Sequence, residues 1–96
     1  MSNVTRLKVR HGGAGLPINF RGRDAWALDA LVSAGERGVT PIERPAPRWS
    51  HYIHRLRKAG LVVETITEQH AGAYSGHHGR YVLRSDVEVL EVERAA

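Results

Sequence analysis

Basic and imidazole side chains gather on one side of the segment 47–59. When the residues are placed at the 100° intervals of an α-helix, one side carries the side chains of Arg48, His51, Arg55 and Lys58. His54 lies at the border of this side. No acidic residue occurs between residues 44 and 63, whereas a solvated helix face commonly mixes charges of both signs. Arginine donates hydrogen bonds in a planar fork, and neutral histidine offers one donor and one acceptor. The pattern favours a surface that binds anions.

The charge is distributed unevenly along the chain. The 96 residues include 14 Lys/Arg and 10 Asp/Glu, which gives a net charge of +4. Residues 1–23 contain five basic side chains and no acid, and residues 44–58 contain five more, again without an acid. From Ser85 onward four acids stand against one base. This polarity predicts one basic side that binds a polyanion; alternatively, the scattered basic residues only keep the protein soluble.

Composition and motifs argue against several classes of function. The absence of cysteine excludes a disulfide framework, thiol catalysis and Cys-ligated zinc. No apolar run approaches the roughly 18–20 residues needed to cross a bilayer, and no serine or glycine-rich segment has the context of a nucleophile elbow or a phosphate-binding loop. His70, His77 and His78 lack further ligands that would complete a metal site. We therefore expect a cytoplasmic, non-enzymatic domain without metal, cofactor, small-molecule ligand or membrane span.

Three helical segments are predicted. The first runs from Asp24 to Ala34, with an apolar stripe formed by Leu28, Leu31 and Val32, and ends at Gly35. The second is short: Thr40-Pro41-Ile42-Glu43 combines a capping box with proline in the first helical position, and Pro45 and Pro47 break the chain soon afterwards. The third is the basic segment 47–59, whose opposite side carries Trp49, Ile53 and Leu56.

The remaining segments favour strands to different degrees. Residues 61–67 and 80–84 are rich in β-branched and aromatic side chains, and a glycine- and histidine-rich loop joins them, so the segment 61–84 is predicted to be a hairpin. Residues 1–21 fit either a basic hairpin or a mobile basic arm. Residues 85–96 fit a helix opened by a second capping box or a strand with alternating valines, and the sequence leaves both open.

This order of elements resembles the small winged helix-turn-helix proteins found in bacteria and their prophages. The resemblance lies in Gly38-Val39-Thr40, in the segment from Tyr52 to Thr65 (YIHRLRKAGLVVET) and in Gly79-Arg80-Tyr81-Val82-Leu83. It implies an α+β fold, with three helices followed by a C-terminal β-hairpin wing, over residues 22–84. A basic N-terminal hairpin or arm (1–21) and an acidic C-terminal tail (85–96) would flank this domain. The chain departs from the simplest members in its prolines and in both flanking segments.

The resemblance also implies a function. We expect a sequence-specific protein that binds double-stranded DNA, either a small transcriptional regulator or a phage-type accessory factor associated with the nucleoid. Helix 47–59 would enter the major groove and hairpin 61–84 would act as the wing. The predicted DNA contacts are Arg44, Arg48, His51, His54, Arg55 and Lys58 on the helix and its approach, and His77 and Arg80 on the wing.

Two further expectations concern partners. Residues 85–96 are the spare element that could mediate a homodimer, as helix-turn-helix proteins often dimerise. The alternative function is a winged-helix module for protein–protein interaction in a phage, replication or regulatory assembly, with the acidic tail or Trp26 as the contact surface. Arg57 is expected to pack its stem against the core or to meet a phosphate.

Overall fold

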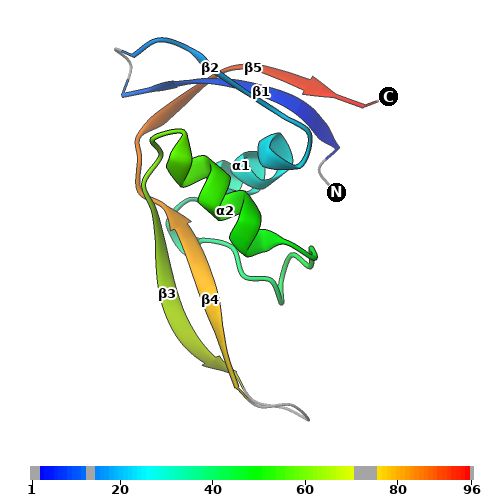
Figure 1. Ribbon diagram of the computed structural model, residues 1–96, viewed down its shortest axis with the longest axis vertical. Coiled ribbons are helices and arrows are strands. Elements are labelled where there is room, and N and C mark those ends of the chain that lie inside the picture. Colours follow the sequence, from blue (N-terminus) through cyan, green and yellow to red (C-terminus); the bar gives the residue numbers. More distant parts are fainter. Residues whose placement is uncertain (1–2, 13–14, 71–75, 96) are drawn as a thin grey trace.

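Two helices lie between a three-stranded sheet and a long β-hairpin (Figure 1). The computed structural model describes residues 3–12, 15–70 and 76–95. Its elements are β1 (Val4–His11), β2 (Ile18–Arg21), α1 (Gly22–Ala34), the 3₁₀ turn η1 (Gly35–Arg37), α2 (Trp49–Lys58), β3 (Val63–His70), β4 (Gly76–Leu83) and β5 (Val87–Arg94). The order confirms the α+β content, and β3 and β4 form the expected hairpin. The hairpin is not C-terminal as predicted, because β5 follows it.

The three-stranded sheet has the order β2-β1-β5, and both pairs are antiparallel. Apolar side chains of β1 and β2, among them Leu7, Val9 and Phe20, are buried in one core with Leu28 and Leu31 of α1. Residues 85–96 therefore do not form an acidic tail outside the domain. Most of them form β5, because alternating valines give this strand an apolar side beside β1 and place its acids opposite basic residues of β1.

Helix α1 buries most of its length. Its small alanine side chains allow neighbouring elements to approach the helix closely on several sides, and Trp26, Leu28 and Leu31 fill the core around them. The helix ends at Gly35, whose φ of 59° lies in the left-handed region that glycine adopts without strain. The expected first helix and its stop are confirmed.

The expected second helix is absent, so the prediction of three helices is wrong: the described residues contain two α-helices. The predicted cap does form in part, because the Glu43 amide donates to Thr40 Oγ1 at 3.1 Å and the Arg44 amide donates to the Thr40 carbonyl at 3.0 Å. The chain then leaves the helical path, since Pro45 and Pro47 supply no amide hydrogen to continue it. The helix predicted over residues 47–59 is α2, and it begins at Trp49 rather than at residue 47.

A short bridge ties the wing to the helical core. The amides and carbonyls of Val39 and Tyr81 exchange two hydrogen bonds of 2.8 Å. Gly38, which precedes this bridge, has a φ of 73°, and a Cβ atom there would lie 2.6 Å from the Tyr81 carbonyl oxygen. Only glycine fits this position. The bridge anchors β4 where the hairpin leaves the core and extends away from the sheet along the longest dimension of the molecule (Figure 1).

Candidate nucleic-acid interface

Helix α2 has two sharply different sides. Trp49, Tyr52, Ile53 and Leu56 are buried in the core. This confirms the predicted apolar stripe and adds Tyr52 to it. The other side carries Arg48, His54, Arg55 and Lys58, which are exposed, and His51, which is half-buried. The structure thus brings five of the predicted contact residues together: four lie on α2, where helical periodicity separates them from the core positions, and Arg48 immediately precedes the helix.

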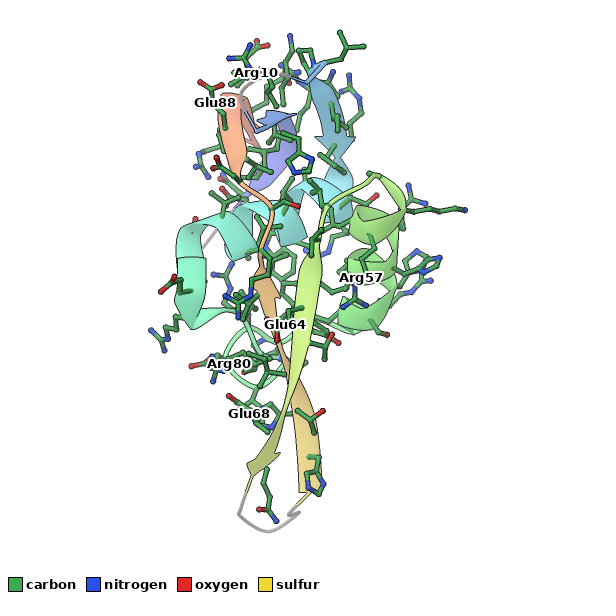
Figure 2. The ribbon with its side chains drawn as sticks, turned by 90° about the vertical axis from the view of Figure 1, so that its left-hand side faces the viewer. Arg10, Arg57, Glu64, Glu68, Arg80 and Glu88 are labelled. Carbon is green, nitrogen blue, oxygen red and sulfur yellow. The ribbon has the colours of Figure 1, made fainter. Side chains whose placement is uncertain are left out.

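Both ends of α2 are fixed to neighbouring segments. At its start, the Trp49 indole Nε1 donates a 2.6 Å hydrogen bond to the Arg44 carbonyl, which closes the proline-rich turn onto the helix. At its end, the Arg57 guanidinium donates to the Val63 carbonyl at 2.6 Å and to Thr65 Oγ1 at 2.9 Å. Figure 2 shows Arg57 beside β3. Arg57 therefore joins α2 to β3 instead of pointing freely into solvent.

An aromatic cluster supports the N-terminal half of α2. The ring centroids of Trp26 and Trp49 are 5.2 Å apart, and Trp49 also contacts Tyr52 and Tyr81. The guanidinium carbon of Arg23 lies 4.1 Å from the Trp26 ring centroid, and that of Arg44 lies 5.5 Å from it. Stacking on an aromatic face orients a guanidinium without neutralising it.

Trp26 is buried, so it cannot be the exposed contact surface considered for a protein partner. Arg23 was not among the predicted contact residues. It belongs to the basic segment 1–23, but only the fold reveals that it lies against α2, where its Nε donates to the Tyr52 hydroxyl at 3.4 Å.

Arg55 has a partner on the first helix. Its Nε donates a 2.6 Å hydrogen bond to Asp24 Oδ2, in the first turn of α1. The Arg55 side chain is still 56% exposed, whereas that of Asp24 is 17% exposed. The two terminal guanidinium nitrogens of Arg55 have no partner among the described residues, so the ion pair orients the group and leaves donors for a ligand.

The wing residues are placed differently. His77 is exposed on β4, but Arg80 is enclosed by acceptors: it donates to Glu68 at 2.7 Å, to Glu43 at 3.1 Å and to the Arg37 carbonyl at 2.9 Å. Figure 2 shows Arg80 and Glu68 on the side of the hairpin away from Arg57. The hydrogen bond from Arg80 lowers the pKa of Glu68, and hydrogen bonds from Arg37 and then Arg80 lower that of Glu43. Arg80 therefore connects the wing to the turn after η1.

The basic residues of β1 are neutralised by β5. Each forms an ion pair with the acid opposite it in the register: Arg6 with Glu93 at 2.7 Å, Lys8 with Glu91 at 3.1 Å and Arg10 with Glu88 at 2.6 Å. Figure 2 shows the last pair at the end of the molecule distant from the wing. The hydrogen bond from Lys8 lowers the pKa of Glu91, and the hydrogen bond that Arg6 donates to Glu93 raises the pKa of Arg6. The N-terminal basic segment and the acidic segment thus cancel each other locally.

This cancellation changes the charge map expected from the sequence. Within the described part of the chain, seven of the basic side chains have no acidic partner. Six of them lie around α2 and one lies at the end of β5: Arg21, Arg23, Arg44, Arg48, Arg57, Lys58 and Arg94. The unneutralised positive charge is therefore concentrated on α2 and on the residues that flank it.

The described residues hold no group of three or more side chains that could bind a metal ion. Among the histidines of the wing, His78 lies 3.1 Å from Glu68, which also accepts from Arg80. In the same part of the chain, no helix is long and apolar enough to cross a membrane.

The comparisons with known proteins give one match. A family model described as a winged helix domain matches residues 17–93. The matched range includes β2, both helices, the wing and nearly all of β5. No curated protein and no solved structure matches the chain significantly.

Proposed function

Because this chain belongs to the winged helix domain family, we propose that it is a sequence-specific protein that binds double-stranded DNA. In this proposal α2 lies in the major groove, which is wide enough to admit a helix. The observation that carries the proposal is the outer side of α2, where exposed Arg48, His54, Arg55 and Lys58 follow one another without an acid. Arg48 and Lys58 have no ion pair among the described residues, so binding a phosphate breaks no internal contact of theirs.

The residues of α2 have different roles in this proposal. Arg48 at the start of the helix and Lys58 at its end are placed to meet phosphates, which supply affinity without sequence information. His51, His54 and Arg55 lie between them and are the candidates for base edges, where an arginine fork matches the O6 and N7 atoms of guanine. Arg44 and Arg23, which stack on Trp26, add positive charge beside the N-terminal half of the helix.

The experiment that tests this function measures binding of the full chain to labelled duplexes by fluorescence anisotropy. Selection from a random duplex pool then gives the preferred sequence. We expect the affinity for random duplex to fall steeply with salt, since Lys and Arg displace counterions from the phosphates. A selected consensus supports sequence-specific recognition. Absence of duplex binding at low salt contradicts the whole proposal.

We propose further that the protein has a regulatory role in a bacterial or prophage setting and that it associates with the nucleoid. A homodimer that presents two copies of α2 would recognise a palindrome, because two-fold symmetry in the protein is mirrored in its site. The selected consensus therefore also reports the oligomeric state: a palindrome supports the dimer, and a single half-site supports a monomer.

One observation favours the second candidate function, a module for protein–protein interaction. β5 is an edge strand, and its Val89 and Val92 are 38% and 40% exposed. Edge strands with apolar side chains are surfaces on which another chain can pair. Retention on a heparin column and on random duplex, followed by size-exclusion chromatography with and without DNA, separates the two functions. A module of this second kind would not be retained at roughly physiological salt.

A further inference from the structure

The end of α2 and the edge strand β2 enclose a depression with a volume of about 460 Å³. Its lining includes Arg21 of β2 and Arg55 and Lys58 of α2, together with one acid, Asp24. Figure 2 shows β2 on the same side of the molecule as α2, whereas β5 lies on the other side. The depression therefore opens next to the surface that the proposed function assigns to DNA.

The cationic side chains that line this depression outnumber its acidic side chains. Three cationic groups line it against a single carboxylate, and that carboxylate is engaged by Arg55 at 2.6 Å. Arg21 and Lys58 are exposed and form no ion pair among the described residues. Two unpaired cations that converge from different elements attract an anion more strongly than either alone, because their potentials add.

The wing offers no comparable site in its described part. Its two arginines are both paired, Arg80 with Glu68 and Arg84 with Glu64 at 2.7 Å each. Each of these ion pairs is neutral overall, so neither arginine offers an unpaired charge to a phosphate that approaches the hairpin. Beside the C-terminal end of α2, the positive charge that is free to meet the backbone of a bound duplex is therefore that of Arg21 and Lys58.

We propose that the depression between β2 and α2 binds a DNA backbone phosphate through Arg21 and Lys58. In this arrangement the N-terminal strand, rather than the wing, supplies the backbone contact next to the recognition helix. Asp24 holds the Arg55 guanidinium in the lining of the same depression, which leaves its two terminal nitrogens to donate to the bound nucleotide. The inference rests on the proposed function, since the anion is a phosphate of the duplex that α2 recognises.

The test compares full-length Arg21→Ala, Lys58→Ala and the double variant with wild type, by anisotropy on one duplex over a series of salt concentrations. Each single change should weaken binding by about threefold to tenfold and reduce the slope of log affinity against log salt by about one, for every sequence alike. If both residues hold one phosphate, the double variant loses less than the product of the two single losses.

The matched control is Arg94→Ala. Arg94 is an exposed arginine at the C-terminal end of β5, and it too has no acidic partner among the described residues. It should leave affinity and salt slope within error of wild type. Circular dichroism and thermal unfolding check that all variants fold, as expected for changes at exposed positions.

The outcomes separate this inference from the proposed function. If Arg21→Ala behaves like Arg94→Ala while Arg48→Ala weakens binding, the protein binds DNA through α2 but the phosphate site at β2 is wrong. Strictly multiplicative losses from the two single changes also overturn the shared site. If wild type binds no duplex, both proposals fail together.

Discussion

Nε of Arg80 lies 2.7 Å from Oε2 of Glu68, which belongs to the opposite strand of the wing. The same guanidinium also donates to Glu43 and to the Arg37 carbonyl, in the segment that joins the helices. Arg80 thus connects the wing to the helical core, in addition to the Val39–Tyr81 bridge and the contacts of Arg57.

The substitution Arg80→Ala should therefore act mainly on stability. We expect a lower midpoint of thermal unfolding, since two glutamates and a carbonyl each lose one hydrogen bond. The duplex affinity should stay within about twofold of wild type, since Arg80 has no free donor on the side proposed to face DNA. Arg84→Ala is the matched control, because Arg84 pairs only with Glu64 and both side chains are about half exposed. A large loss of affinity by Arg80→Ala without a change in unfolding temperature would assign this arginine to DNA instead.

Stability should also depend on pH in the acidic range. Hydrogen bonds from arginine and lysine hold the pKa values of Glu43, Glu68 and Glu91 below their ordinary value of 4.5 in the folded state. These ionised groups stabilise the fold fully above that value, and the stabilisation is lost as pH falls through the lower folded pKa values. The unfolding temperature should be nearly constant from about pH 7 to 5 and should fall below about pH 4.5.

The variant Glu68→Gln isolates one of these contributions. It should unfold at a lower temperature than wild type near neutral pH and show a shallower decline in acid, because one titrating group is gone. Parallel curves for variant and wild type would contradict the assigned role of Glu68.

The close approach at Gly38 gives a backbone prediction. Alanine at Gly35 meets no neighbour within 4 Å and should cost about 1–2 kcal/mol in the free energy of unfolding, from its positive φ alone. Alanine at Gly38 has the same backbone penalty and also meets the Tyr81 carbonyl at 2.6 Å, so its cost should be distinctly larger. Urea unfolding of the two variants measures both costs, and equal values would exclude the steric role of the Val39–Tyr81 bridge.

Local signals predicted the parts of this fold that depend on neighbouring residues. The spacing of Trp49, Ile53 and Leu56 predicts the buried side of α2, and Gly35 predicts the end of α1, because both depend on helical geometry alone. The short second helix that the sequence predicts does not form. Thr40 caps a turn as expected, but one turn is too little to continue as a helix when two prolines follow.

The pairing of β1 with β5 could not be predicted, because it joins residues more than seventy positions apart. The ion pair between Arg6 and Glu93 illustrates the consequence. The sequence assigned these residues to a basic hairpin or arm and to an acidic tail, whereas the fold places them 2.7 Å apart. The same limit applies to Arg80, whose partner Glu43 lies far away in the sequence.

Asp24 orients the Arg55 guanidinium, and Arg55 is proposed to recognise a base. At the preferred sequence, Arg55→Ala should cost about 1–3 kcal/mol of binding free energy, and it should relax discrimination at one position of the site. Binding to random duplex should change less. A loss below twofold at the preferred sequence would show that Arg55 contacts no base.

The most direct test of the central claim is the salt dependence of duplex binding by wild type and by the double variant Arg48→Ala/Lys58→Ala. The positive charge that remains unneutralised around α2 predicts that log affinity falls against log salt with a slope of about −3 to −5 for wild type, and with a slope less steep by about two for the variant. Equal slopes for the two proteins, or a wild-type affinity that does not respond to salt, would contradict the assignment of α2 as the DNA-binding surface.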